Sequence, residues 1–180
     1  MLAGPRAPGR GTAAQAMSSP EEIRVALHDL AAGPPALGRL VNRAPREAWD
    51  LRDPELGGWS AREIVAHLAD LEFNLHFTAR VARILQEDEP VLDAAEADWR
   101  ALVHRHRNQE PAVALGAYTM ARKHMIAVLL EVGPAAWDRA GLHPEAGRVT
   151  LLEVVRGFAR HDRRHIDRVR ELFALLPTAD

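Results

Sequence analysis

Apolar residues recur at helical spacing through most of the chain, and the clearest run lies between Trp59 and Glu87. Ser60 and Glu63 form the reciprocal pair of a capping box, so a helix is expected to begin just after Ser60. Its apolar and small residues then recur at alternating steps of four and three, which is the pattern of a bundle helix with one buried seam. The predicted seam consists of Ile64, Leu68, Leu71, Leu75, Thr78, Ala82 and Leu85.

Two further helices are predicted on either side of this one. The first begins at Ser19-Pro20-Glu21-Glu22, a second capping box with proline in the first helical turn. Gly33-Pro34-Pro35 interrupts its apolar stripe, and a proline inside a helix removes a hydrogen bond and crowds the preceding turn, so we expect a bent or broken helix. The other is predicted from about residue 111 to 132, with a seam of Tyr118, Ala121, Met125, Val128 and Val132.

The last predicted helix follows the capping box of Thr150-Leu151-Leu152-Glu153 and runs from about Leu151 to Leu176, where Pro177 ends it. Residues 87–110 are expected to form a long crossover with some helix around residues 94–103. No segment shows the convincing alternation of a β-strand. The pattern therefore predicts an all-α protein, a four-helix bundle with a long crossover connection.

The chain is expected to contain one folded domain. Residues 1–18 are rich in Gly, Pro and Ala and lack an apolar period, so they are predicted to be a disordered N-terminal segment. Residues 19–177 are predicted to form a single bundle domain, an ordinary size for one hydrophobic core. No stretch approaches the roughly 20 apolar residues of a membrane helix, so we expect no membrane partner.

Composition removes several classes of function. The 180 residues include no cysteine, which excludes disulfides, thiolate metal sites and cysteine nucleophiles together. Only three serines occur, and none lies in a G-x-S-x-G turn, which argues against a serine hydrolase. A net charge of −2 provides no large cationic field, so no nucleic-acid partner is expected. The Glu-x-x-His pairs of a di-iron bundle and the glycine-rich nucleotide motifs are also absent.

The apolar stripe of the last helix contains two histidines, His161 and His165. Residues four apart lie on one helix face with Cβ atoms roughly 6 Å apart, so the two imidazoles can converge on one metal ion. His67 lies on the flank of the seam of the helix after Ser60 and adds a third inward-pointing imidazole. Three neutral nitrogens and an open position are typical of a catalytic site for one divalent ion, Zn²⁺, Ni²⁺ or Fe²⁺. The alternative is a hydrogen-bonded polar core without a metal.

With these residues the chain resembles the DinB-like, or YfiT-like, metal-binding four-helix bundles. The resemblance covers about residues 20–176. It is carried by Trp59-Ser60, the run from His67 to Glu72, Pro90, Tyr118, Arg122, the turn from His143 to Leu151, and the run from His161 to Ile166. It implies the fold of that family, with its three histidine ligands at His67, His161 and His165.

The resemblance implies a mononuclear metal enzyme. It indicates less clearly which reaction that enzyme catalyses. Some relatives activate a low-molecular-weight thiol cosubstrate, such as bacillithiol or mycothiol, for transfer, and others are described as metal-dependent hydrolases. Thiol transfer is slightly favoured by resemblance alone, while a chain without cysteine fits both reactions. The alternative from another class is a non-catalytic, metal-stabilised bundle that acts as a binding or interaction module.

Two acidic residues after His67 are the predicted catalytic groups. Asp70 lies on nearly the same helix face as His67 and is preferred as a general base or as a residue that orients a ligand imidazole. Glu72 matches an acidic position of the family that the chain resembles. The alternative for both Asp70 and Glu72 is an ordinary charged side chain on the solvated surface. A small-molecule substrate and a homodimer are further implications of the resemblance, and the absence of cysteine is consistent with a cytoplasmic protein.

Overall fold

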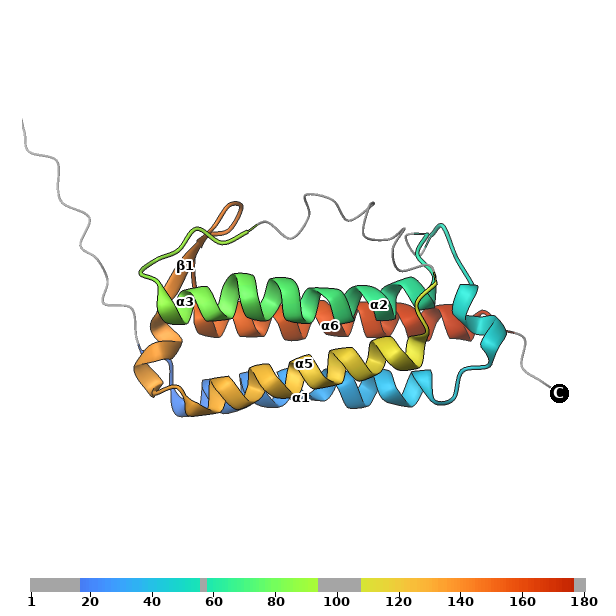
Figure 1. The fold of residues 1–180 in the computed structure, drawn as a ribbon, viewed down its shortest axis with the longest axis horizontal. Helices are drawn as coiled ribbons and strands as arrows, with labels where there is room; N and C mark the ends of the chain where they lie inside the picture. Colours follow the sequence, from blue (N-terminus) through green and yellow to red (C-terminus); the bar gives the residue numbers. More distant parts are fainter. Residues whose placement is uncertain (1–16, 56–57, 94–107, 177–180) are drawn as a thin grey trace, which may run out of the picture.

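The computed structural model describes residues 17–55, 58–93 and 108–176, in which four long helical segments dominate (Figure 1). The segments are α1 (Pro20–Val41), the continuous run of α2 (Ala61–Leu71), η2 (Glu72–Val81) and α3 (Ala82–Gln86), α5 (Pro111–Glu131) and α6 (Leu151–Ala174). The short elements are η1 (Arg46–Asp50), η3 (Pro134–Asp138), β1 (Ala140–His143) and β2 (Gly147–Thr150). The predicted four-helix bundle is confirmed.

The order of the helices around the bundle differs from their order along the chain. α1 packs against α5 and α6, and α2 packs against the same two helices, so α1 and α2 lie on opposite corners. In Figure 1 the neighbours α2 and α5 run in the same direction, and α1 and α6 run in the other. Arg62 at the start of α2 donates to the carbonyl of Gln109 just before α5, at 3.2 Å. The end of α3 and the start of α5 therefore lie at opposite ends of the bundle, as the predicted crossover requires.

Capping boxes begin three of the four helical segments. In each box the N-cap hydroxyl accepts a backbone N–H from the third helical residue, whose glutamate side chain accepts the N–H of the N-cap residue. The pairs are Ser19 with Glu22, Ser60 with Glu63, and Thr150 with Glu153. Each cap is worth about 1 kcal/mol. The predicted starts of α1, α2 and α6 are thus confirmed.

The second helical segment changes its hydrogen-bonding pattern at Glu72. From there η2 is a π-helix, in which bonds join residues five apart, and its end shows this in the bond from the N–H of Ala82 to the carbonyl of Phe77. A wider turn rotates the following residues relative to an α-helix. The predicted seam is therefore correct through Leu71 and only partly correct beyond it, where Leu85 still packs against the core. Thr78 is exposed, and the buried side chains are those of Glu72, His76, Val81 and Ile84.

The α1 helix continues through Gly33-Pro34-Pro35, so the predicted break does not occur. Pro34 has no N–H to donate to the carbonyl of Leu30 one turn earlier. The guanidinium of Arg122 on α5 donates to that carbonyl instead, with Nη1 2.6 Å from the oxygen. A tertiary contact thus replaces the backbone hydrogen bond that proline removes, which local sequence could not indicate.

Two apolar clusters form the core, one toward each end of the bundle. The cluster at the hairpin end includes Leu30, Ile84, Met125, Trp137 and Phe158. The other includes Leu37, Ile64, Leu68, Tyr118 and Ile166. Along the four helical segments, the buried polar residues Glu72, His76, Arg122 and Asp162 lie between members of these two clusters. A polar layer therefore crosses the middle of the bundle.

A β-hairpin joins η3 to α6, although no strand was predicted. β1 and β2 pair in antiparallel fashion from Ala140 opposite Thr150 to His143 opposite Gly147. Gly147 has a φ of +73°, a conformation that glycine adopts without strain. Strands of four residues are too short to show a reliable alternation in sequence. Because Thr150 both ends β2 and caps α6, the hairpin fixes the start of the helix that carries His161 and His165.

Two sequence predictions concern residues outside the described ranges. These are the helix around residues 94–103 and most of the N-terminal segment 1–18. Ser18 is described, and its N–H and hydroxyl both donate to Oδ1 of Asp138, at 2.9 and 2.7 Å. Among the helices of the described residues, none combines the length and apolar composition needed to cross a bilayer.

Candidate metal centre

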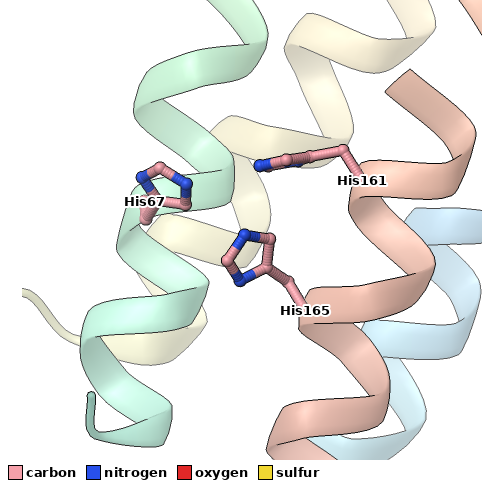
Figure 2. Close-up of side chains that lie close together, drawn as sticks. All are labelled: His67, His161 and His165. Carbon is pink, nitrogen blue, oxygen red and sulfur yellow. The ribbon is translucent and has the colours of Figure 1, made fainter. Parts of the chain in front are cut away.

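His67, His161 and His165 converge between α2 and α6 (Figure 2). One ligand nitrogen from each ring lies within 4.8 Å of those of the other two. The ring centroids are 5.5 Å apart for His67 and His161, 5.0 Å for His67 and His165, and 4.4 Å for His161 and His165. Nitrogens that share a tetrahedral ion at about 2.1 Å lie about 3.4 Å from one another, so a contraction of at most about 1.4 Å completes such a site.

The triad is partly buried, and burial favours the neutral form of His165. His67 is 9% exposed, and the side chain of His161 is 20% exposed. Burial, together with the neighbouring His161, lowers the pKa of His165 to about 3. A neutral imidazole retains the nitrogen lone pair that binds a metal. The donor set therefore suits a borderline divalent ion such as Zn²⁺, Ni²⁺ or Fe²⁺.

An aromatic side chain covers one side of the triad. The ring of Trp59 meets that of His67 edge-on, with centroids 4.9 Å apart, and lies 6.2 Å from that of His165. Trp59 directly precedes the N-cap of α2, so the capping box that starts the helix also positions this indole. Surface clefts of about 550 and 420 Å³ lie elsewhere and include none of the three histidines among their lining residues. Solvent therefore reaches the triad through the partly exposed rings of His161 and His165.

A buried ionic network lies directly behind the triad. Arg122 donates from Nε and Nη2 to the two carboxylate oxygens of Glu72, and its Nη1 forms an ion pair with Oδ2 of Asp162 at 2.8 Å. The hydroxyl of Tyr118 donates to the same Oδ2 at 2.8 Å. Although burial raises the pKa of the Glu72 carboxyl, hydrogen bonds from Arg122 and His76 outweigh this effect and hold that pKa below its usual value. The network is therefore ionised at neutral pH.

His76 is a site residue that sequence reasoning missed. Its ring stacks on Phe158 at 3.9 Å, and its Nδ1 lies 3.2 Å from Oε2 of Glu72. The centroid of His161 is 5.6 Å away, with the two rings perpendicular. Burial lowers the pKa of His76, and a carboxylate only accepts hydrogen bonds, so His76 is neutral with its proton on Nδ1. In an unbroken α-helix, His76 and His67 would lie on opposite faces, and the π-helix brings His76 inward.

The two predicted catalytic carboxylates have different surroundings. Glu72 is fully buried, and both of its oxygens accept hydrogen bonds in the ionic network. Asp70 lies on the half-exposed side of α2, where its Oδ1 accepts from the amide of Asn74 at 2.9 Å. The alternative that Glu72 is a solvated surface charge is therefore wrong. The catalytic roles of Asp70 and Glu72 stay predictions.

Two further acidic residues lie beside the histidines on α6, and each pairs with an arginine, Asp162 with Arg122 and Asp167 with Arg170. Asp162 is 2% exposed, and no sequence pattern indicated that it lies in the core. Its carboxylate also lies beside His161, where Oδ1 is 3.9 Å from Nδ1 of that ring.

Comparison with known proteins places the chain in a family. The sequence model of the DinB superfamily matches residues 29–169, more than three quarters of the chain. The chain belongs to the DinB superfamily. The match spans the three histidines as well as Glu72, Arg122 and Asp162. The predicted family is therefore confirmed.

Similar proteins carry the name "Putative metal-dependent hydrolase". One, from Oceanobacillus iheyensis, is 26% identical over 117 residues, which cover 64% of this chain and 66%, just under two thirds, of that protein. Another, from Bacillus mycoides, is 24% identical over 139 residues, which cover 74% of this chain and 79% of that protein.

A solved structure confirms the fold. YfiT from Bacillus subtilis is described as a probable metal-dependent hydrolase with an unusual four-helix bundle topology. It matches with a TM-score of 0.76 and 21% sequence identity, over 92% of this chain and 91% of that one. At this identity the likeness establishes the shared fold alone.

Proposed function

We propose that this protein is a mononuclear metal-dependent hydrolase, in which His67, His161 and His165 bind one divalent ion. The observation that carries the proposal is the convergence of three ligand nitrogens within 4.8 Å in a half-buried site. A structural tetrahedral site uses four protein ligands, whereas three histidines are typical of sites that keep a position open. In such a site, a bound divalent ion lowers the pKa of a bound water or thiol toward neutrality and so supplies a nucleophile.

The protein's own residues prepare this chemistry. Burial keeps His165 unprotonated, so its lone pair is available without loss of a proton. Trp59 shields one side of His67, which limits solvent on the α2 side. The partly exposed edges of His161 and His165 leave the opposite side for a small-molecule substrate.

We assign the proton-accepting role to Asp70 in preference to Glu72. Both oxygens of Glu72 are held by Arg122 or His76, so its carboxylate is fixed and already hydrogen bonded. Asp70 lies three residues after His67 on the side of α2 that solvent reaches, and its bond from Asn74 is an ordinary neutral one. A proton acceptor must exchange its proton with solvent after each turnover, which favours Asp70.

Hydrolysis is preferred over thiol transfer because the similar proteins are named as hydrolases. Thiol transfer remains the second candidate, since a chain without cysteine would have to borrow a thiol as cosubstrate. The two reactions differ in one measurable way. A hydrolase turns over with water alone, whereas a transferase requires an added low-molecular-weight thiol.

Metal analysis of protein purified without an affinity tag tests the site. Wild type should contain about one divalent ion per chain, identified by elemental mass spectrometry, and His67→Ala and His161→Ala should each lose it. His28→Ala is the matched control, because His28 is exposed on α1 and lies outside the triad. Stoichiometric metal in both triad variants would refute the proposed ligand set.

Activity assays then separate the candidate functions. Small esters and amides should be hydrolysed by metal-loaded wild type without thiol, and the rate should fall at least 100-fold in His67→Ala and about 10- to 100-fold in Asp70→Asn. A reaction that proceeds only with added thiol would favour transfer. If chelation lowers only stability, and neither reaction is detected, the non-catalytic bundle gains support. The homodimer and the cytoplasmic location stay predictions, and light scattering at several protein concentrations tests the former.

A further inference from the structure

Two buried polar atoms face each other beside the triad without a hydrogen-bond partner. They are Nδ1 of His161 and Oδ1 of Asp162, and they lie 3.9 Å apart. This distance is too long for a hydrogen bond, yet one atom is a potential donor and the other an acceptor. A buried polar group without a partner costs about 1–3 kcal/mol, so the pair is favoured to close as soon as Nδ1 carries a proton.

The Asp162 carboxylate is held from its far side by other helices. Its Oδ2 accepts a hydrogen bond from the hydroxyl of Tyr118 and forms an ion pair with Nη1 of Arg122, each at 2.8 Å. The same Nη1 donates to the carbonyl of Leu30, so α1 also helps to hold the Arg122 guanidinium in place. The close approach depends on Gly33, where a methyl group would lie 2.5 Å from the Tyr118 hydroxyl and 3.1 Å from Oδ2. Two groups, the Tyr118 hydroxyl and the Arg122 guanidinium, therefore hold one carboxylate oxygen directly, and the other oxygen points toward His161.

The shape of an imidazole connects this contact to the metal site. Its two nitrogens point in widely different directions, so when Nδ1 faces Asp162, Nε2 points away from it. Figure 2 shows a nitrogen at the tip of the His161 ring, on the side of His67. Metal-binding histidines commonly donate their second ring N–H to a carboxylate, which fixes the tautomer and the ring orientation.

We propose that Asp162 is a positioning residue that holds His161 with its proton on Nδ1 and presents Nε2 to the metal ion. This inference rests on the proposed metal site. Asp162, which follows His161 directly in the sequence and which Arg122 and Tyr118 hold in place, thus takes the ligand-orienting role. Asp70, the residue predicted for that role, does not.

The charge of the network supports the same conclusion. Arg122 contributes one positive charge, and Glu72 and Asp162 contribute one negative charge each, so the buried cluster has one negative charge in excess. An excess charge in the core is costly unless an opposite charge compensates it. A divalent ion bound by His161 would lie one imidazole away from that charge. Removal of the Asp162 charge leaves a neutral Arg122–Glu72 pair, so the variant core remains balanced.

Cobalt titration of the full chain tests the inference, because the visible spectrum of Co²⁺ reports ligand geometry. Asp162→Leu should bind Co²⁺ about 10- to 100-fold more weakly than wild type and change the spectrum. Asp162→Asn retains an oxygen acceptor and should lie between the two. Asp167→Asn removes a largely exposed carboxylate from the same helix and should remain within twofold of wild type. Thermal unfolding of the metal-free variants identifies any that fail to fold.

Nitrogen-15 NMR of Zn²⁺-loaded wild type gives a second test that needs no variant. The His161 ring should show a protonated, slowly exchanging Nδ1 and a metal-bound Nε2. Binding through Nδ1, or Asp162→Leu with the affinity and spectrum of Asp167→Asn, would overturn the inference. Absence of Co²⁺ and Zn²⁺ binding by wild type would instead refute the proposed function itself, so the two failures are distinguishable.

Discussion

Replacement of Gly33 by alanine should destabilise the protein, whereas the same change at Gly116 should stabilise it. Both glycines lie inside long helices, where alanine is ordinarily better by about 0.5–1 kcal/mol. At Gly116 a new methyl group would meet no atom within 4 Å. At Gly33 it would lie 2.5 Å from the Tyr118 hydroxyl, well inside van der Waals contact, so either the helix or the tyrosine must move.

The magnitude follows from the atoms that must move. Overpacking in a dense core costs about 1–3 kcal/mol. Displacement of Tyr118 also breaks its hydrogen bond to Asp162, a further cost of about 1 kcal/mol. After the gain in helix propensity is subtracted, Gly33→Ala should lower the free energy of unfolding by about 1–3 kcal/mol. Gly116→Ala should raise it by about 0.5–1 kcal/mol.

Urea unfolding of the metal-free proteins, followed by far-UV circular dichroism, measures both changes. A double-mutant cycle with Tyr118→Phe identifies the cause, because phenylalanine lacks the oxygen that the methyl group would meet. The cost of Gly33→Ala should fall by at least 1 kcal/mol in the Tyr118→Phe background. An equal cost in both backgrounds would locate the strain in the backbone before Pro34 and refute the role of the tyrosine contact.

Three further outcomes are expected. Arg122→Met should lower the free energy of unfolding by about 3–5 kcal/mol in urea, because it leaves the buried carboxylates of Glu72 and Asp162 without their positive partner. A loss below about 1 kcal/mol would contradict the ionic network. Burial raises the pKa of Glu63, but hydrogen bonding by Arg52 outweighs it, so the folded pKa lies below the ordinary value of 4.5. A carboxylate with a lowered folded pKa stabilises the protein above its unfolded pKa and loses this effect as pH falls through the folded value. The difference in unfolding free energy between wild type and Glu63→Gln should therefore be about 1 kcal/mol at pH 7 and shrink as pH falls through the folded pKa. A difference independent of pH would argue against a contribution from the Glu63 charge. Zn²⁺ at 100 times its dissociation constant should raise the unfolding free energy of wild type by about 2.7 kcal/mol, reversibly with chelator. No rise at any Zn²⁺ concentration would show that the folded state does not bind the ion more tightly than the unfolded state.

Local chemistry determined much of the fold in advance. A capping box involves residues three apart, and a helical seam involves residues three and four apart, so both can be read without knowledge of the rest of the chain. Ser60 with Glu63 and Thr150 with Glu153 gave the starts of α2 and α6. The spacing of His161 and His165 made them a pair on one face for the same reason.

The arrangement of the polar layer was decided by contacts between helices. Whether Glu72 and His76 face the core depends on the π-helical turn, which has no reliable local signal. Whether α1 continues through Pro34 depends on Arg122, which lies on another helix and supplies the missing hydrogen bond. The sequence showed on which helices Arg122 and Asp162 lie, but it did not indicate that the two side chains would form an ion pair in the core.

The sequence alone thus determined where three of the helices begin, that the chain forms a bundle, and which three histidines to consider together. Their meeting, and the carboxylate behind His161, were decided only in three dimensions. The physical reason is range: caps and helical periods are set by neighbours along the chain, whereas the cost of burying a charge depends on distant residues that bring the compensating charge.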